Sequence, residues 1–463
     1  MALRQNKQNA PNPCGNGIKL RKSQELKNLL LSIINTQKQD LTGLVSNPDS
    51  DFSRNRKIPY EKMILSLFTM EGTTLTNELL RQFGCDVSTA TSSAFVQQRK
   101  KILPLAFEKL FKDFVSQTSR NNNYKGYKLL AVDGSDIQIP TNTSDEESLF
   151  ITKEGIKPYN LLHLNALYDL CTHTYEDAIV FKRKEAGENK ALTEMVDRSA
   201  IVGKSIVIMD RGYESYNNMA HIQEKGWFYL IRVKDFGKHK TGIVDGLDLP
   251  DTDEFDEYID LNLTRKQTNE IKRQLQNKNK YRRIANNKTF DYLPSTSRKA
   301  DATVLYHLPF RIVRFPISED SYEVVVTNLG FEEFPPEELK KLYGMRWGIE
   351  TSFRDLKYTV GLLHFHSKKV EYILQEIFAS LIMYNFSELI TSHVVIEKGT
   401  KKHEYKVNFS VAVHICREFL LKATIPPDIE ALIARYITPI RPGRSRPRDM
   451  RVKQAISFMY RVA

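Results

Sequence analysis

The chain has 463 residues, of which 41% are hydrophobic, so it is long enough to bury a core spread over about three domains. Lys and Arg outnumber Asp and Glu, which gives a net charge of +12 at pH 7. This composition excludes an acidic disordered protein and favours a folded protein with a polyanionic partner. Nucleic acid is the first candidate, and an anionic membrane surface is the second.

The longest apolar stretch, residues 372–390, predicts a buried helix rather than a membrane span. It is interrupted by four polar residues that a lipid bilayer would accept only at high cost, namely Gln375, Glu376, Asn385 and Glu388. We therefore expect no membrane partner. Residues 1–17 lack the apolar region of a signal peptide, so we expect a cytoplasmic, nucleoid-associated protein.

Residues 1–120 carry mostly helical periodicity and predict an N-terminal helical domain that could bind DNA. Within it, residues 74–102 predict a helix, a turn at Gly84 and a second helix. The second helix is expected to begin at an N-cap, Ser88, and to end in Arg99, Lys100 and Lys101. Two interpretations stay open: a helix-turn-helix reader of DNA, or a helical hairpin whose basic end complements its own dipole.

Residues 121–236 change to short apolar runs that are typical of strands. These runs are residues 127–133, 159–170, 176–181, 205–210 and 227–233. A helical pattern separates the third run from the fourth, and another separates the fourth from the fifth. Three strands, helix, strand, helix, strand is the order of a ribonuclease H-like sheet, so this segment is predicted to be the first part of such a core.

Residues 237–321 interrupt this order as an insertion that is acidic at first and basic later. From 264 to 300 it carries eleven basic residues: Arg265, Lys266, Lys272, Arg273, Lys278, Lys280, Arg282, Arg283, Lys288, Arg298 and Lys299. Such a run is either a solvated face or a phosphate-binding surface, and the sequence favours neither.

Residues 322–395 are predicted to complete the core, with a strand over 322–329 and a long helix that opens at Pro335. Residues 396–463 are predicted to form a C-terminal helical segment with a basic tail, whose charges are Arg441, Arg444, Arg446, Arg448, Arg451 and Lys453. The tail either touches DNA or is a disordered basic end.

Three acidic residues are candidates for chemistry. Asp133 and Asp210 each end an apolar run, where a carboxylate can emerge at the edge of a buried sheet, and Glu350 lies in the helix that opens at Pro335. At about 100° per residue, Glu350 shares one narrow stripe of that helix with four other polar residues. They are Tyr343, Arg346, Arg354 and Lys357.

Phosphoryl transfer on DNA uses two divalent cations about 4 Å apart, one beside the attacking oxygen and one beside the leaving oxygen. Carboxylates are suitable ligands, because Mg²⁺ and Mn²⁺ prefer oxygen donors. The alternative is that Glu350 only forms ion pairs with Arg346 and Arg354, and that the two Asp residues merely terminate strands.

The local motifs favour the chemical interpretation. The spacing Y-x2-R-x3-E-x6-K, formed by Tyr343, Arg346, Glu350 and Lys357, resembles the signature of the bacterial insertion-sequence DDE transposases of the insertion-sequence-four group. In that group Gly follows the first Asp and the second Asp opens the motif Asp-Arg-Gly-Tyr, as at residues 133–134 and 210–213 here. Ser135 stands where the family often has Thr. The resemblance covers residues 60–395.

This resemblance implies a fold class and an activity. The fold would be α/β, a ribonuclease H-like mixed sheet interrupted by a largely β insertion, with an N-terminal helical domain. Asp133, Asp210 and Glu350 would bind two Mg²⁺ ions, for which Mn²⁺ could substitute, to nick transposon ends and join the 3′-OH to target DNA. Tyr343, Arg346 and Lys357 would hold the DNA. The expected partners are double-stranded DNA, as transposon ends and target, and a second copy of the chain once assembled on DNA.

Two other functions stay open. A metal-dependent nuclease without joining activity would keep the same three acids, and a catalytically inactive DNA-binding regulator would have lost one of them. Asp136 and Asp169 are interpreted as structural rather than metal-binding. His364 and His366 are interpreted as polar surface residues, because no Cys or His partner stands at metal-ligand spacing.

Overall fold

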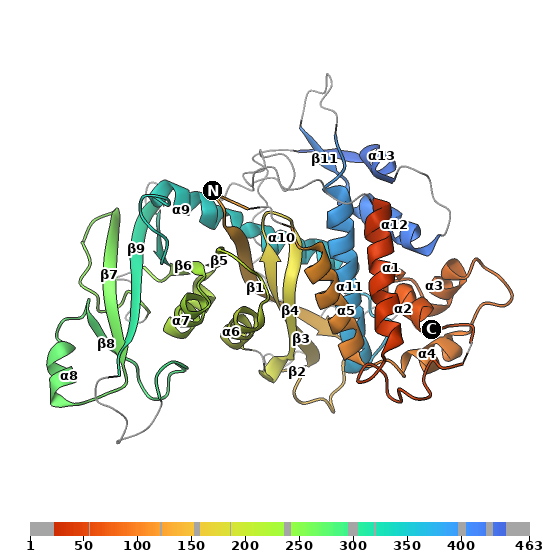
Figure 1. The fold of residues 1–463 in the computed structure, drawn as a ribbon, viewed down its shortest axis with the longest axis horizontal. Coiled ribbons are helices and arrows are strands. Elements are labelled where there is room, and N and C mark those ends of the chain that lie inside the picture. Colours follow the sequence, from red (N-terminus) through yellow and green to blue (C-terminus); the bar gives the residue numbers. More distant parts are fainter. Residues whose placement is uncertain are drawn as a thin grey trace.

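The computed structural model describes residues 23–54, 56–120, 123–151, 158–185, 187–235, 242–294, 304–318, 321–396, 404–422 and 429–440. Figure 1 shows an elongated molecule with a helical body at one end, a sheet in the middle and the strands of the insertion at the other end. Arg298, Lys299 and the predicted basic tail from Arg441 onward lie outside the described residues.

One large sheet of ten strands runs through the described part of the molecule, in the order β2-β3-β1-β5-β6-β10-β9-β7-β8, with β4 also paired to β3. All five predicted core runs form strands. The strands are β1 (Lys128–Ile139), β2 (Leu149–Phe150), β3 (Tyr159–Asp169), β4 (Thr174–Lys182), β5 (Ser205–Met209), β6 (Phe228–Val233), β7 (Phe255–Thr264), β8 (Tyr281–Arg283), β9 (Tyr306–Ser318) and β10 (Ser321–Thr327).

The five core strands have ribonuclease H-like pairing. β4, β3 and β1 are antiparallel neighbours, and β1, β5 and β6 are parallel neighbours. The parallel steps need crossovers, which helices α6 (Glu188–Arg198) and α7 (Tyr216–Glu224) supply around β5. β5 is buried on both faces, which explains its uninterrupted apolar sequence. The predicted fold class, a mixed α/β protein with a ribonuclease H-like core, is confirmed.

Alternate residues of β1 feed two separate cores. Leu130 and Val132 pack with α6 and α7, whereas Leu129 and Ala131 face the helical body. The helices on that second face include α5 (Pro104–Thr118), α10 (Trp347–Tyr358) and α11 (Val370–Thr391). A side chain's position along β1 therefore decides which layer of helices it meets.

The described part of the insertion lengthens the same sheet. β7, β8 and β9 continue it beyond β10, and the short helix α8 (Asn269–Gln274) lies between β7 and β8 in the chain. β9 pairs antiparallel with β10, the strand that leads back into the core. The insertion is thus joined to the core by backbone hydrogen bonds and not by a linker alone.

The N-terminal helical body contains α1 (Ser23–Gln39), α2 (Tyr60–Thr69), α3 (Leu75–Gln82) and α4 (Ser92–Arg99). The predicted pair of helices around Gly84 forms, but the prediction of Ser88 as N-cap is wrong. Thr91 caps α4 by accepting from the Ala94 amide, whereas the Ser88 amide donates to Asp86 Oδ1. The run of hydroxyl residues after Gly84 offered several caps, and the Asp86 turn excludes the first of them.

Helix α11 is long and apolar enough to cross a membrane, but 89% of that window is buried inside the protein, so this is weak evidence for a span. Its polar residues are hydrogen-bonded within the core. Asn385, for example, contacts both backbone groups of Tyr175, and Gln375 donates to the Ile102 carbonyl. Two further C-terminal helices contact α11, α12 (Phe409–Leu421) and α13 (Ile429–Ala434), and the strands β11 (Tyr405–Val407) and β12 (Ile437–Pro439) pair with each other as a separate small sheet.

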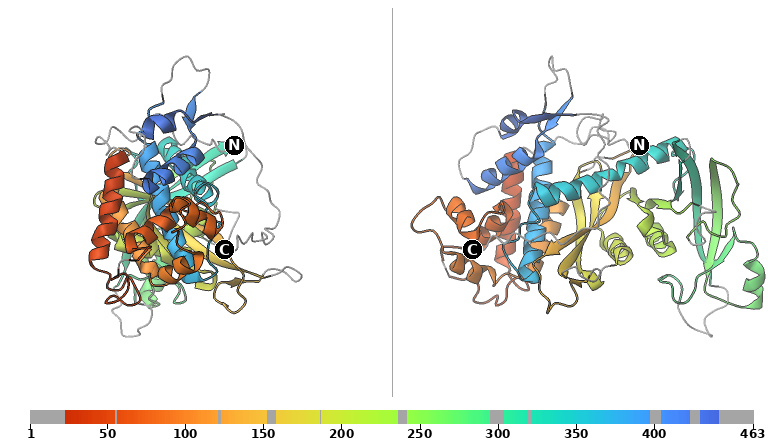
Figure 2. Two further views of the ribbon diagram at one scale, coloured as in Figure 1. Left: turned by 90° about the vertical axis from the view of Figure 1, so that its right-hand side faces the viewer. Right: turned by 180° about the vertical axis from the view of Figure 1, so that it is seen from behind.

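The predicted long helix after Pro335 is two successive helices, α9 (Pro336–Met345) and α10. They run from the insertion strands towards α11 (Figure 2). The break is at Arg346, whose amide donates to Tyr343 O at 3.1 Å while its carbonyl accepts from the Ile349 amide at 3.1 Å. Both bonds span three residues and tighten the turn, so the phase of the polar stripe changes at this point.

Candidate active site

Asp133 and Asp210 lie side by side where β5 ends against β1, which itself continues to Ile139, and we call the group that they form with Glu350 and Arg346 the acidic edge. The parallel register pairs Ala131 with Ile208, so the two Asp residues stand at equivalent positions, each two residues further on. Residues two apart on a strand point to the same face, and neighbouring strands are about 4.8 Å apart. Both carboxylates therefore emerge on the face covered by α10.

Local hydrogen bonds fix the start of each acidic motif. Asp133 Oδ1 accepts from the Gly134 amide at 2.8 Å, and Asp210 Oδ1 accepts from the Gly212 amide at 2.8 Å. Asp210 is the N-cap of the short 3₁₀ helix η2 (Arg211–Tyr213). The Asp-Arg-Gly-Tyr motif is thus a tight turn that its own first residue closes.

Glu350 reaches this edge from α10, and Arg346 lies between it and Asp133. Arg346 Nη2 donates to Glu350 Oε1 at 2.8 Å, and Nη1 is 3.9 Å from Asp133 Oδ2. Arg346 is only 5% exposed. The tightened turn at the α9–α10 junction carries this guanidinium inward, so it neutralises part of the charge of two of the three acids.

The three acids interact electrostatically. Burial raises the pKa of Asp133, and the charges of Asp210 and Glu350 raise it further. Arg346 and the Gly134 amide oppose the rise, but the pKa still reaches about 7. Carboxylates that crowd one another in this way favour a positive charge between them.

The three residues predicted to hold DNA, Tyr343, Arg346 and Lys357, lie around the acidic edge. In the structure each of them contacts other residues of the protein. Tyr343 is 5% exposed, and its ring centroid lies 5.8 Å from the Arg346 guanidinium. Lys357 reaches from α10 to β1, where its ammonium donates to the Asp136 carbonyl at 2.7 Å. Arg354 is exposed, so the predicted stripe does not form one uniform surface.

Sequence reasoning missed two residues on the opposite face of β1. Glu188 opens α6, and its carboxylate would be closer than 3.0 Å to a Cβ placed on Gly134. His163, on β3, lies closer still to the same position and contacts Asp136. The available signal was the glycine that follows Asp133, because a strand that lacks a side chain there admits another group.

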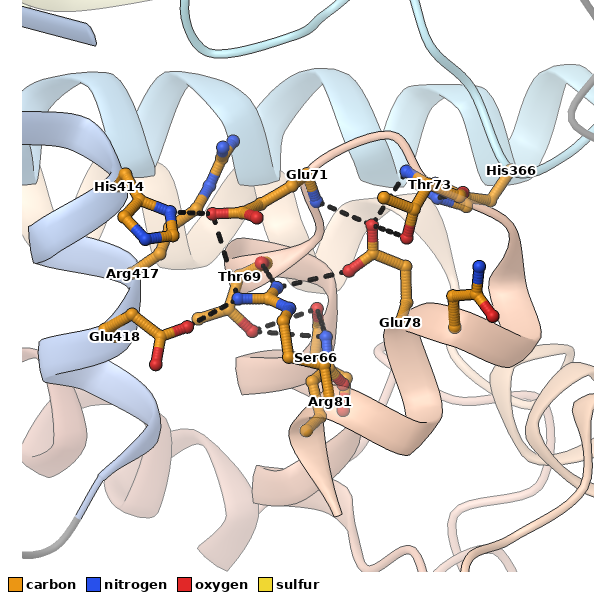
Figure 3. A network of polar contacts seen from close by, with 12 residues as sticks. Ser66, Thr69, Glu71, Thr73, Glu78, Arg81, His366, His414, Arg417 and Glu418 are labelled. Carbon is orange, nitrogen blue, oxygen red and sulfur yellow. Dashed lines mark hydrogen bonds and ion pairs between the residues drawn. The ribbon is translucent and has the colours of Figure 1, made fainter. Parts of the chain in front are cut away.

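Other predicted residues have structural partners. Asp169 accepts from the Cys171 and Thr172 amides, which agrees with a structural role. The interpretation of His366 as a surface residue is wrong. Its side chain is 5% exposed and contacts Glu376 and the Thr73 carbonyl, because the segment after α10 folds against the N-terminal helices (Figure 3).

Part of the basic end of α4 forms ion pairs within the protein. Arg99 is buried and pairs with Glu376 at 2.8 Å, and Lys101 pairs with Asp51, whereas Lys100 is exposed. Two of the three charges that suggested a DNA reader therefore attach α4 to the helical body. The α3–α4 hairpin retains one exposed basic residue at this end.

The donors at the acidic edge fit a hard divalent cation. No three His, Cys, Asp or Glu side chains of the described residues already converge as a metal cage. The three groups are nevertheless all carboxylates, and a guanidinium already lies between Asp133 and Glu350. Donor type and charge therefore suit Mg²⁺ or Mn²⁺.

An acidic edge on a ribonuclease H-like sheet is an arrangement suited to enzymes that cut or join nucleic acid with carboxylate-bound cations. The model of the family described as Transposase DDE domain matches residues 124–386. The chain belongs to this family, and DNA is therefore its substrate. The match includes every core strand and all three acids.

Comparison with individual proteins adds little to this assignment. None of the curated proteins matches the chain. Among solved structures, the chain is similar to a piggyBac transposase in a cryo-EM structure of its synaptic complex with hairpin DNA. Sequence identity is 11%, the TM-score is 0.45, and the alignment covers 90% of this chain and 87% of the other. The strand order of the chain itself, rather than this likeness, defines the fold.

Proposed function

We propose that the protein is a transposase of the insertion-sequence-four group that cleaves transposon ends and joins the 3′-OH to target DNA, with Mg²⁺ as cofactor. The observation that carries this proposal is the register that sets Asp133 beside Asp210, with Glu350 facing them from α10. The motif formed by Tyr343, Arg346, Glu350 and Lys357 supports the narrower group.

Asp133, Asp210 and Glu350 would hold the cations in this mechanism. Two bound Mg²⁺ ions supply activation of the attacking oxygen and stabilisation of the leaving oxygen. The chain's own contribution is to fix the carboxylates on rigid elements. Asp133 is on a central strand, Asp210 closes a turn and Glu350 is one turn into a helix, so none depends on a flexible loop.

Arg346 and Lys357 would position the DNA strand next to the acids. Arg346 already lies within ion-pair distance of two carboxylates, so a scissile phosphate held at this edge would be within its reach. Tyr343 precedes it by one helical turn, and its side chain interacts with the Arg346 guanidinium. We further propose that two copies of the chain assemble on paired ends.

A strand-joining assay tests the proposed function against both alternatives. The substrate is a labelled duplex that carries the inverted repeats flanking the gene, with a free 3′-OH, incubated with protein, Mg²⁺ and a plasmid target. Joined product is expected. A duplex ending in a 3′-deoxy nucleotide should give none, because it lacks the attacking hydroxyl.

The failure modes are distinct. Cleavage of a second duplex that keeps the flanking DNA, without joining of the duplex that has the free 3′-OH, would identify a metal-dependent nuclease. Binding without cleavage would identify a regulator. The Asp210→Asn protein is the matched control, since it keeps the shape of the side chain and removes its charge.

A further inference from the structure

A chain of contacts behind the acidic edge connects all three elements that carry the acids. His163 Nδ1 lies 2.7 Å from Asp136 Oδ1, and His163 Nε2 lies 3.2 Å from Glu188 Oε1. We name these three residues the His163 bridge. The antiparallel register pairs Asp136 directly with His163, so the bridge starts between β1 and β3 and ends at the first turn of α6.

The His163 bridge lies close to the backbone at Gly134 and Gly212, the glycines next to Asp133 and Asp210. A Cβ at Gly134 would come closer than 3.0 Å to His163 Nε2 and Glu188 Oε1, and one at Gly212 would lie 3.5 Å from Glu188 Oε2. Gly134 follows Asp133, and Gly212 binds the Asp210 carboxylate through its amide. Glu188 thus contacts both acidic segments from the face opposite to α10.

The third acid is attached to the same bridge. Lys357, two turns after Glu350 on α10, donates to the Asp136 carbonyl at 2.7 Å. From Glu350 the path runs through Lys357, Asp136 and His163 to Glu188. Both faces of the sheet are therefore coupled at the one strand that carries Asp133.

The buried hydroxyl of Tyr213 lies near Glu188 of the His163 bridge and near the two Asp residues of the acidic edge. Tyr213, the last residue of the Asp-Arg-Gly-Tyr motif, is 1% exposed, and its hydroxyl has no hydrogen-bond partner. Burial raises the pKa of Tyr213, and the charges of Glu188, Asp133 and Asp210 raise it further. The hydroxyl is thus close enough to all three carboxylates to respond to each of them.

We propose that Asp136, His163 and Glu188 are positioning residues that hold Asp133, Asp210 and Glu350 at the separation that paired cations require. This proposal rests on the proposed function. It assigns Glu188 no direct contact with metal, and it gives Gly134 a reason: only a residue without a side chain lets the bridge approach β1. Groups that orient metal ligands without touching the metal commonly contribute about 10- to 100-fold in metal affinity.

The molecule contains a matched control, which lies away from the acidic edge. His221 on α7 contacts Asp197 Oδ1 and Asp291 Oδ2, each at 2.9 Å. Its side chain is 9% exposed, and that of His163 is 7% exposed. Loss of either histidine removes the same kind of bridge, but only one bridge touches the acidic segments.

The experiment measures Mn²⁺ binding to the full-length protein without DNA, by electron paramagnetic resonance of free Mn²⁺, together with melting temperature. His163→Ala and Glu188→Gln should each weaken Mn²⁺ binding about tenfold. His221→Ala should lower the melting temperature to a similar extent and leave Mn²⁺ binding unchanged. Glu188→Gln keeps the size of the side chain and carries the test if His163→Ala fails to fold.

A second pair of variants tests the steric part. Gly134→Ala should weaken Mn²⁺ binding, and adding His163→Ala should cause little further loss, because both changes disrupt the same approach of the bridge to β1. Simple additivity of the two effects would overturn the proposal.

Three further outcomes distinguish a positioning role from a ligand role and separate this proposal from the proposed function. If Glu188→Gln loses one bound Mn²⁺ while His163→Ala keeps both, Glu188 is a ligand and the positioning role is wrong. If Asp133→Asn abolishes Mn²⁺ binding while both bridge variants bind normally, the positioning role fails and the proposed function stands. If Asp133→Asn binds Mn²⁺ normally, both fail.

Discussion

Two clusters of charge in this protein each gather several carboxylates around one arginine but differ in how completely the charges are paired. The first is the acidic edge, formed by Asp133, Asp210, Glu350 and Arg346. The second joins the N-terminal helices to α12 and consists of Glu71, Glu78, Arg81, His414 and Glu418 (Figure 3). We call it the helical-junction network.

Every oxygen of the central carboxylate in the helical-junction network is used. Glu78 Oε1 accepts from the amides of Glu71 and Thr73 and from the Thr73 hydroxyl, and Oε2 pairs with Arg81 at 3.1 Å. Burial alone would raise the pKa of Glu78, but these donors outweigh it and lower the pKa. At the acidic edge the balance is reversed, and the pKa of Asp133 rises to about 7.

The difference shows how to distinguish a structural carboxylate from one that binds a cation. Glu78 is fully buried and Asp133 is partly buried, and both have an arginine nearby: Arg81 lies between Glu78 and Glu418, as Arg346 lies between Asp133 and Glu350. Burial and an ion pair therefore do not identify a site. Insufficient hydrogen-bond donors combined with neighbouring like charges do.

The largest expected effect is on the acidic edge. Asp133→Asn, Asp210→Asn and Glu350→Gln should each remove orders of magnitude from Mg²⁺-dependent strand cleavage, because each side chain is expected to hold a cation. Melting temperature without metal should not fall for Asp133→Asn and Asp210→Asn, since each removes a like charge, whereas Glu350→Gln also removes the ion pair with Arg346. Cleavage assays and thermal melts on the same preparations decide this. Near-normal cleavage by any variant would exclude that residue.

The next largest effect is expected from removing Arg346 or Arg81, because the two variants should differ in activity and in stability. Arg346→Ala should reduce cleavage about 100-fold, because a misplaced scissile phosphate reacts slowly. It should also increase the rise in melting temperature that Mg²⁺ causes, since the competing cation is gone. Arg81→Ala should lower melting temperature and leave single-turnover cleavage unchanged. If the two variants behave alike, the distinction between the clusters is wrong.

The helical-junction network should respond to pH. Glu78→Gln places an amide NH₂ against Arg81 and should reduce the free energy of unfolding by about 3 kcal/mol at pH 7. Because folding lowers the pKa of Glu78, its contribution is present above the unfolded value of 4.5 and is lost as pH falls through the folded value. The difference between variant and wild type should therefore shrink in acid.

Urea unfolding at several pH values measures this effect. Glu108→Gln is the matched control, because Glu108 forms an exposed ion pair with Lys112. It should cost less than about 1 kcal/mol at every pH. A deficit for Glu78→Gln that is constant with pH would contradict the ionised pairing.

The sequence was informative where one pattern has one structural meaning. Apolar runs in the order of the core predicted the sheet. Asp210 follows the end of β5, as its apolar run predicted, whereas β1 continues past Asp133 to Ile139 because its second half pairs with β3. Four polar residues predicted that α11 is buried, and three of them, Gln375, Glu376 and Asn385, bind other elements of the helical body or β4. The boundaries of the insertion and of the terminal segments stay predictions.

It was uninformative where a side chain's partner is distant in the sequence. Helical periodicity treated 343–357 as one uniform stripe, but the three-residue hydrogen bonds at Arg346 turn that side chain inward. No local sequence pattern identifies His163 and Glu188. They reach the site only because β1 pairs with β3 and because α6 begins beside β1. His366 was misplaced for the same reason, since Glu376 and Thr73 reach it only in the folded chain.

The smallest effect concerns charges that belong to neither cluster. The structure divides the basic run of the insertion into two kinds of residue. Arg282 donates to the Ile243 carbonyl and the Tyr216 hydroxyl, and Arg265 donates to the Ala285 carbonyl, so both hold the insertion together. Lys272 and Arg273 on α8 are exposed. Reversing the charge of Arg282 would lower stability as well as DNA binding, and the two effects could not be told apart. Reversing the charges of the exposed Lys272 and Arg273 is therefore the sharper test.

Lys272→Glu with Arg273→Glu should weaken DNA binding evenly across sequences and reduce the slope of log affinity against log salt by about 1 for each phosphate that the variant no longer neutralises. Lys109→Glu with Lys112→Glu on α5, an equally exposed pair in the helical body, is the control and should leave the slope nearer to that of wild type. Fluorescence anisotropy on a short duplex at several salt concentrations measures both. Equal slopes in the two double variants would show that the basic run of the insertion is a solvated face, because charges that contact no phosphate should change the slope by the same amount in both variants.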